Sequence, residues 1–245
     1  MSDCCKTGFQ WDGKAVGKES KIANLDTYIT GSNKEAAVLI VHDVFGWTLN
    51  SMRLLADHYA AEADVTVYLP DFFGGEIVDP DTMSDPAKFA KFDLKAFVTR
   101  HAKEIRQPEI FAVAKALKNE LGFKKVGAIG FCYGGWAVAR LGAKGSNLVD
   151  AITAAHPSMI TKEELANIGV PTQILAPETD PEYTPELKEY THQVFPTLNI
   201  EYDYQFFPGL FHGFAARGDP SNPAQRRGVE RAKNAVVYWF SVQLH

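Results

Sequence analysis

The chain has 245 residues, of which 46% are hydrophobic and 22% charged, and its formal net charge at pH 7 is −5. This composition supplies one large globular core, so we expect a single α/β domain over residues 1–245, with an N-terminal arm at 1–24. A mildly acidic chain without a basic run or a long apolar run argues against nucleic-acid and membrane partners.

The first elements after the arm alternate between strand and helix. The apolar run at 36–43 ends at polar residues, which is typical of a buried strand. Apolar side chains at helical spacing predict a helix at 51–63, and the β-branched run at 64–69 predicts the next strand. Residues 70–85 are rich in Asp, Gly and Pro, which predicts a long surface loop of the kind that often carries function.

The alternation continues to the C-terminus. Two helices are predicted at 89–99 and 108–121, with a break at Pro108. The remaining patterns predict strands at 124–131, 149–155, 171–176 and 200–207, and helices at 135–142 and 225–243. The last of these strands alternates apolar and polar residues, so we expect it near an edge of the sheet.

Alternating strands and helices predict βαβ units, and therefore an α/β fold with a mostly parallel sheet and helices on both faces. In such sheets, chemistry gathers at the carboxyl ends of the strands. The candidate functional residues are therefore those that follow the predicted strands: His42, Asp43, Asp71, Cys132, His156, residues 178–180 and the loop 208–218.

The stretch GAIGFCYGG, residues 127–135, places one cysteine between glycines at the end of a strand. Gly130, Cys132 and Gly134 fit G-x-C-x-G, the nucleophile elbow with Cys in place of Ser. The sharp turn leaves room only for small residues on either side of the nucleophile. The helix that follows stabilises negative charge at the thiol. The alternative is a glycine-rich turn that binds phosphate or nothing, with Cys132 as a packing residue.

Two later residues fit the chain order of nucleophile, acid and histidine. Asp180 follows the strand predicted at 171–176, and His212 lies in the loop before the final helix. A thiol needs a base, and an imidazole needs a carboxylate that fixes its tautomer. We prefer Asp180 because it lies further past its strand, where the chain can turn back towards the histidine. The competing residues are Glu178, Asp203, His42, His156 and His192.

Further residues are expected around the cysteine. The backbone amides of Val44 and Tyr133 are candidate donors to an oxyanion. His156, which precedes a proline, is interpreted as structural or pocket-lining. Several aromatic rings are candidates for a pocket wall, with core packing as the alternative: Trp47, Phe72, Phe73, Tyr133 and Phe214.

The cysteine count indicates a reducing compartment. Three cysteines are odd in number and too few for a disulfide framework, so we expect a cytoplasmic protein. The N-terminus lacks the apolar segment of a secretory signal. Cys4 and Cys5 have no C-x-x-C or His-rich partner, so we expect no metal and no cofactor. The expected oligomeric state is a monomer or a homodimer.

Taken together, these residues resemble the dienelactone hydrolases, or carboxymethylenebutenolidases. The resemblance runs from about residue 25 to the C-terminus and rests on four segments: the elbow at 130–135, Asp43-Val-Phe-Gly46, residues 178–180 and the loop at 212–219. Cys4-Cys5 and that last loop are most similar to fungal members. The resemblance implies an α/β-hydrolase fold and a catalytic triad of Cys132, His212 and Asp180.

The chain departs from the bacterial members that it resembles. In those enzymes a Glu in the loop after an early strand holds the resting thiol, and the matching position here is Asp43, one methylene shorter. They also use two arginines to hold the substrate carboxylate. Arg217 lies near one of these positions, offset by one residue, and no arginine lies between Arg53 and Arg100, where the other belongs. Esters and lactones other than dienelactone therefore fit at least as well.

The expected function is hydrolysis of small-molecule carboxylic esters or lactones. Cys132 would form a thioester, which water activated by His212 would hydrolyse. Enol lactones and aryl esters are favoured because their leaving groups are good. Two alternatives stay open: a thiol acyltransferase, and a non-catalytic thiol protein that responds to oxidation.

Overall fold

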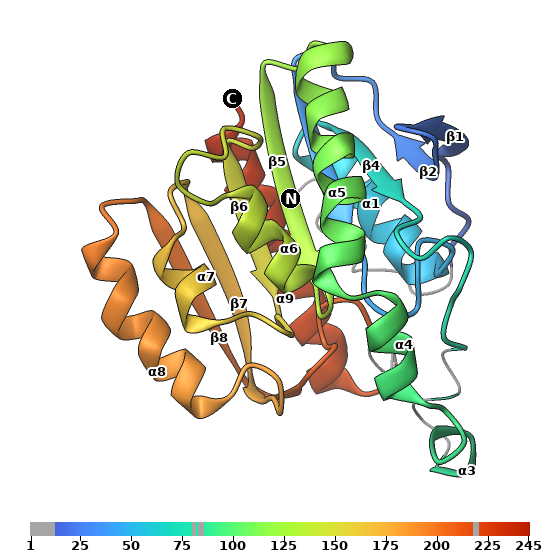
Figure 1. The fold of residues 1–245 in the computed structure, drawn as a ribbon, viewed down its shortest axis with the longest axis vertical. Helices are drawn as coiled ribbons and strands as arrows, with labels where there is room; N and C mark the ends of the chain where they lie inside the picture. The colour runs from blue at the N-terminus through green and yellow to red at the C-terminus, as the bar shows by residue number, and fades with distance from the viewer. Residues whose placement is uncertain (1–12, 80–81, 83–85, 218–220) are drawn as a thin grey trace.

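The structure is a computed structural model that describes residues 13–79, 82, 86–217 and 221–245 (Figure 1). Cys4 and Cys5 lie outside the described residues, as does the first half of the predicted arm. Within the described part of the chain, the strands are β1 (Lys18–Ile22), β2 (Leu25–Thr30), β3 (Ala36–Val41), β4 (Thr66–Pro70), β5 (Lys125–Phe131), β6 (Ala151–Ala155), β7 (Thr172–Thr179) and β8 (Tyr202–Phe211).

These strands form one sheet in the order β1-β2-β4-β3-β5-β6-β7-β8. From β4 to β8 every pair of neighbours is parallel, and β1 and β2 add an antiparallel edge. The prediction of a mostly parallel sheet is therefore confirmed, and β8 lies at the edge as its alternating pattern indicates. This topology brings the carboxyl ends of β3, β5, β6, β7 and β8 to one side of the molecule.

Helices cover both faces of the sheet. They are α1 (Asn50–Glu62), α3 (Pro86–Phe89), α4 (Leu94–Arg100), α5 (Lys103–Lys115), α6 (Gly134–Leu141), α7 (Lys162–Ala166), α8 (Pro185–Val194) and α9 (Pro223–Gln243), with a π-helical turn at Ala116–Glu120 and a 3₁₀ turn at Phe195–Thr197. In Figure 1, α5, α6 and α7 lie in front of the sheet, and α9 lies behind it. Residues of α1 and α9 share the core on that far face. Across the described residues, no helix is both long and apolar enough to cross a membrane.

Strand β3 shows why the central strands are apolar without interruption. Successive side chains of a strand point to opposite faces, and here both faces are covered by helices. Ala37, Leu39 and Val41 pack in the core beneath α5 and α6. The alternate residues pack in the core beneath α1 and α9: Ala36, Val38 and Ile40.

The antiparallel edge of β1 and β2 was not predicted. Four of the five residues of β1 are exposed, so this strand has no apolar signal of its own. A two-residue turn joins it to β2, and both turn residues, Ala23 and Asn24, have positive φ, as in a tight hairpin. Part of the predicted arm at 1–24 is thus an edge strand of the sheet.

The predicted helix break at Pro108 is wrong. The break lies at His101 and Ala102, where α4 ends and α5 begins. Pro108 lies inside α5, where it removes one hydrogen bond to the carbonyl of Glu104. Both residues are exposed, so this carbonyl lies on the solvent side of the helix, and the helix continues.

Candidate active site

Cys132 lies in a sharp turn between β5 and α6. Its φ of +48° is a left-handed conformation that residues other than glycine rarely adopt. The backbone amide of Cys132 lies 3.1 Å from the carbonyl oxygen of Ala155 and 3.2 Å from Nδ1 of His156. These contacts with the end of β6 hold the strained residue in place, as expected of a strained backbone at a functional site.

Close backbone approaches explain the glycines around Cys132. A Cβ atom on Gly130 would lie 2.1 Å from the carbonyl oxygen of Gly134. A Cβ atom on Gly134 would lie 2.1 Å from the carbonyl oxygen of Val41 in β3. The sequence-based argument that only small residues fit on either side of the cysteine therefore agrees with the geometry.

We expect Gly134→Ala to lower the free energy of unfolding by roughly 3 kcal/mol. The added methyl group would clash with backbone of a central strand, which cannot rotate away as a side chain can. Gly122→Ala is the control, because Gly122 has a φ of +75° but nothing within 4 Å of an added Cβ atom. That variant should lose only about 1 kcal/mol for its left-handed backbone. Chemical denaturation measures both, and equal losses would contradict the steric argument.

His212 and Asp180 lie side by side at the ends of β8 and β7. The amide of His212 donates to the carbonyl oxygen of Thr179 at 3.1 Å, which joins the two strand ends. Nδ1 of His212 lies 2.8 Å from Oδ1 of Asp180, whose side chain is fully buried. The same oxygen accepts hydrogen bonds from the amides of Glu182 and Tyr183 at 2.9 and 3.0 Å. This carboxylate is therefore fixed in position and keeps a proton on Nδ1 of the imidazole.

The electrostatics of this pair favour a charged imidazole. Burial opposes the charge on His212, but the hydrogen bond to Asp180 and the contact with Cys132 outweigh it and raise the pKa of His212 to about 10. Burial also opposes ionisation of Asp180, but His212 and two backbone amides bring its pKa below the ordinary value. At neutral pH the pair is therefore imidazolium and carboxylate.

Ser158 lies next to both the thiol and the imidazole. Its Oγ is 3.3 Å from Sγ of Cys132 and 3.4 Å from Nε2 of His212. Our sequence reasoning missed this residue. The available signal was its place two residues after His156, just past the end of a strand.

The competing acids have other contacts. Glu178 is exposed and accepts a hydrogen bond from the amide of Gly209 at 2.6 Å. Asp203 accepts one from the side chain of Gln173 at 2.8 Å. His192 lies on α8, where its ring packs against Tyr204. None of these three side chains is among the described residues that line the pocket of Cys132.

Two of the competing histidines hold backbone segments instead. His42 lies 2.8 Å from the carbonyl oxygen of Asp43 and accepts from the amide of Phe72 at 3.2 Å. His156 accepts from the amide of Cys132 through Nδ1. Both rings are buried, and burial lowers the pKa of each, so both are neutral at pH 7. The structural interpretation of His156 fits these contacts.

A pocket of about 260 Å³ lies over the thiol and is lined by Cys132, Ser158 and His212. Its apolar lining comes from side chains that are mostly aliphatic: Val44, Leu94, Val98, Met159 and Pro181. Of the aromatic residues suggested for the wall, Tyr133 alone is among the described residues that line it.

The other suggested aromatic residues lie in the core. Trp47 is 8% exposed and packs under the guanidinium of Arg53, 4.9 Å from the ring centroid. Phe214 is 6% exposed and packs against Phe207, with ring centroids 4.6 Å apart. Phe72 and Phe73 are likewise buried. The predicted substrate-binding positions of Trp47 and Phe214 are therefore corrected: neither is among the described residues that line the pocket, because their rings pack in the core beneath α1 and α9.

Val44 and Tyr133 line the pocket together with Cys132. Within the described part of the chain, neither backbone amide donates a hydrogen bond. The amide of Cys132 itself is occupied by Ala155 and His156. The two candidate oxyanion donors are therefore at the pocket with their N–H groups available.

Asp43 and Arg217 form an ion pair at the pocket rather than contacts with the thiol. Oδ2 of the fully buried Asp43 side chain lies 3.3 Å from Nε of Arg217, and Oδ1 accepts from the amide of Phe45 at 3.0 Å. The guanidinium also stacks on the ring of Phe45, 4.0 Å from its centroid. Arg217 thus lines the pocket, and its charge is paired with Asp43.

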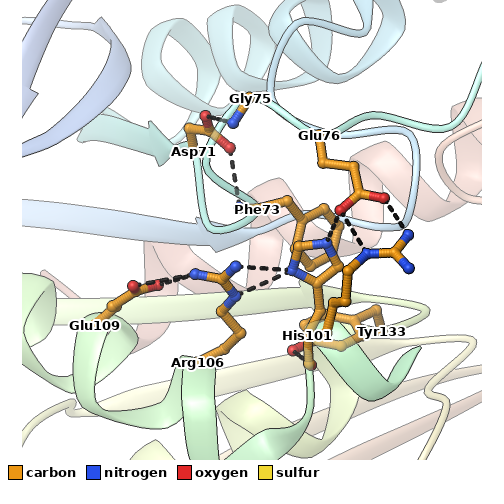
Figure 2. Close-up of polar contacts among 9 residues, drawn as sticks. Asp71, Phe73, Gly75, Glu76, His101, Arg106, Glu109 and Tyr133 are labelled. Carbon is orange, nitrogen blue, oxygen red and sulfur yellow. Dashed lines mark hydrogen bonds and ion pairs between the residues drawn. The ribbon is translucent and has the colours of Figure 1, made fainter. Parts of the chain in front are cut away.

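A polar network around the buried ring of His101 anchors Tyr133 (Figure 2). The Tyr133 hydroxyl donates to the backbone carbonyl of His101 at 2.5 Å. Nδ1 of His101 accepts from Arg106, and Nε2 lies 2.9 Å from the carboxylate of Glu76. Because arginine only donates, the proton of the neutral ring is on Nε2. The network therefore links the residue after the elbow cysteine to the loop that follows β4 and to α5.

We expect Tyr133→Phe to lower the free energy of unfolding by about 1–2 kcal/mol, because it leaves the carbonyl of His101 buried without its donor. The ring contacts with Phe73 and Trp136 are retained, so the protein should still fold. The control is Tyr238→Phe, since Tyr238 is 72% exposed and should change stability little. Equal unfolding midpoints for the two variants would contradict the anchoring role.

Comparison with known proteins gives the family. Residues 25–244 match the dienelactone hydrolase family. Hydrolase pyvD of Aspergillus violaceofuscus is 29% identical over 246 residues, covering 99% of this chain and 97% of that protein. The carboxymethylenebutenolidase homolog of Homo sapiens is 30% identical over 244 residues, covering 97% and 95%.

The fold agrees with this match. The dienelactone hydrolase of Anabaena variabilis superposes with a TM-score of 0.65 at 15% identity, over 95% of this chain and 99% of that one. The α/β-hydrolase fold implied by the elbow is thereby confirmed. The sequence match and the shared fold together show that the chain belongs to the dienelactone hydrolase family and is a carboxylic ester or lactone hydrolase.

Proposed function

We propose that Cys132, His212 and Asp180 form a catalytic triad that cleaves small esters and lactones through a thioester on Cys132. One observation carries this proposal. A thiol on a strained elbow shares one pocket with an imidazole that a buried carboxylate holds in a fixed tautomer. This combination of nucleophile, base and orienting acid is what covalent acyl transfer needs.

The first step is attack of the thiolate on the substrate carbonyl. The charged imidazole of His212 stabilises the thiolate, and the N-terminus of α6 adds its positive dipole end. The oxyanion of the tetrahedral intermediate accepts hydrogen bonds from the amides of Val44 and Tyr133. Collapse expels the leaving group, which takes its proton from His212, and leaves an acyl group on sulfur.

The second step is hydrolysis of the thioester. His212, now neutral, accepts a proton from water, and the hydroxide attacks the thioester carbonyl. The same two amides hold the second oxyanion. Asp180 stabilises the imidazolium each time it forms, so both steps use one acid–base pair.

The pocket favours small substrates with limited charge. Its volume of about 260 Å³ is below the range of pockets that bind drug-sized ligands. The guanidinium that lines the pocket, Arg217, is already paired with Asp43. We therefore propose small neutral enol lactones and aryl esters as the main substrates, with substrates that carry a carboxylate less favoured.

The test is to trap the acyl group during turnover of p-nitrophenyl acetate. We expect a burst of about one p-nitrophenolate per chain, and an acetyl group on the Cys132 peptide after an acid quench. Turnover of a dienelactone, measured in parallel, tests the substrate preference. Turnover with an acetyl group on another residue, or with no acyl group at any time, would contradict the thioester mechanism.

A further inference from the structure

The turn after β6 is built onto the elbow. His156 and Met159 have positive φ, so the chain reverses sharply between them. The amide of Ser158 donates to the carbonyl oxygen of Cys132 at 2.7 Å, and the amide of Cys132 is held by His156. Pro157 packs closely against Gly135: a Cβ atom added to Gly135 would lie 2.3 Å from Cβ of Pro157. These contacts fix the backbone of Ser158 relative to the thiol.

The hydroxyl of Ser158 is held at hydrogen-bonding distance from both the thiol and the imidazole, at 3.3 and 3.4 Å. The residue is 5% exposed, so its rotamers are restricted by packing. A hydroxyl has one hydrogen to donate and lone pairs to accept. With a proton on Nε2 of His212, Oγ accepts from the imidazolium and donates its own hydrogen to sulfur.

Asp43, the acid at the end of β3, does not form a hydrogen bond with the thiol. Asp43 is occupied by Arg217 and by the amide of Phe45. Among the described residues, the polar side-chain contacts of the thiol are therefore with Ser158 and His212. Because Arg217 and the amide of Phe45 hold Asp43, the hydroxyl of Ser158 and not the carboxylate of Asp43 lies next to the sulfur.

We propose that Ser158 is a further catalytic residue, which bridges the Cys132 thiolate and the His212 imidazolium. The proton of the thiol passes to Oγ of Ser158 while the proton of that hydroxyl passes to Nε2 of His212. The products are a thiolate, an unchanged hydroxyl and an imidazolium, so protons and charge balance without a further reactant. This inference rests on the proposed triad, because it assigns Ser158 a role in maintaining the reactive ion pair.

The test is the pH dependence of Cys132 alkylation by iodoacetamide in the full chain, with peptide mapping to separate Cys132 from Cys4 and Cys5. Ser158→Ala removes a hydrogen bond to two charged groups. We expect the midpoint of its pH profile to rise by about one unit, so the alkylation rate at a pH below the wild-type midpoint should fall about tenfold. For p-nitrophenyl acetate, kcat/KM and the rate of the burst should fall about tenfold, because both report acylation by the thiolate.

The double variant His212→Ala/Ser158→Ala tests whether the effect of Ser158 on the thiol depends on His212. In a His212→Ala background the bridge has only one end, so Ser158→Ala should change alkylation less than twofold. Ser241→Ala is the matched control, since it deletes a hydroxyl bonded to the carbonyl of Val237 in α9, and should behave as wild type. An undiminished effect of Ser158→Ala in the His212→Ala background would overturn the proposal.

The other outcomes distinguish the two proposals. An unchanged alkylation profile in Ser158→Ala overturns the bridge, whatever happens to turnover. Lower turnover with an unchanged profile would mean that Ser158 contacts substrate instead. A shifted profile in a protein that hydrolyses neither ester nor lactone would support the bridge while contradicting the proposed catalytic function.

Discussion

Cys132→Ala is expected to lower kcat/KM for p-nitrophenyl acetate by about 10,000-fold or more. Without sulfur no acyl-enzyme forms, and only binding and the oxyanion donors remain. Steady-state release of p-nitrophenolate measures the loss, and the burst and the acetylated peptide should both disappear. The effect is specific to the thiol because alanine keeps the Cβ atom and the backbone strain of the turn.

Two controls accompany this prediction. Cys132→Ala should still fold and unfold in one cooperative transition, because the elbow is held through backbone groups of Cys132. Cys132→Ser should remain far less active than wild type, because a serine hydroxyl is a much weaker acid than a thiol and does not supply the charged nucleophile of the proposed first step. Turnover by Cys132→Ala at the wild-type rate would refute the nucleophile and return Cys132 to a packing or redox role.

That Cys132, Asp180 and His212 lie at one end of the sheet could be predicted, because chain order and topology are linked in a parallel sheet. Each of Cys132, Asp180 and His212 follows a strand, and the carboxyl ends of those strands meet on one side. The glycines of the elbow could be predicted for the same local reason, since the collisions they avoid occur within the turn and with the adjacent strand. Sequence reasoning succeeds where the cause is local or set by strand order.

The residues that were missed depend on how separate segments dock. Ser158 lies next to the thiol only because its turn packs against the elbow, and no local sequence pattern predicts that contact. Trp47 and Phe214 follow strands as the pattern requires, yet their side chains turn into the core. The ion pair of Asp43 joins residues 174 positions apart. Such contacts are determined by side-chain packing, which periodicity and order along the chain do not describe.

Asp180→Asn is expected to lower kcat for p-nitrophenyl acetate by about 1,000-fold or more, with little change in KM. The carboxylate oxygen that binds Nδ1 of His212 becomes part of a neutral amide, so the imidazolium loses its stabilising charge. The amide also disfavours the tautomer with its proton on Nδ1. Glu178→Gln is the matched control, because Glu178 is an exposed acid two residues earlier whose carboxylate binds the Gly209 amide instead. It should retain near wild-type activity.

The pH dependence of Asp180→Asn gives a second and independent readout. The pKa of His212 is raised from 6.5 to about 10 in the folded protein, against burial, partly by Asp180. A raised pKa contributes stability that is fully present below pH 6.5 and is lost as the pH rises to about 10. The stability difference between wild type and Asp180→Asn should therefore be larger near pH 6 than near pH 10, and the alkaline limb of activity should move to lower pH. Equal kcat values and equal pH profiles for Asp180→Asn and Glu178→Gln would show that Asp180 does not orient His212. No other described carboxylate oxygen lies within hydrogen-bonding distance of that ring, so no second acid would hide the effect of Asp180→Asn.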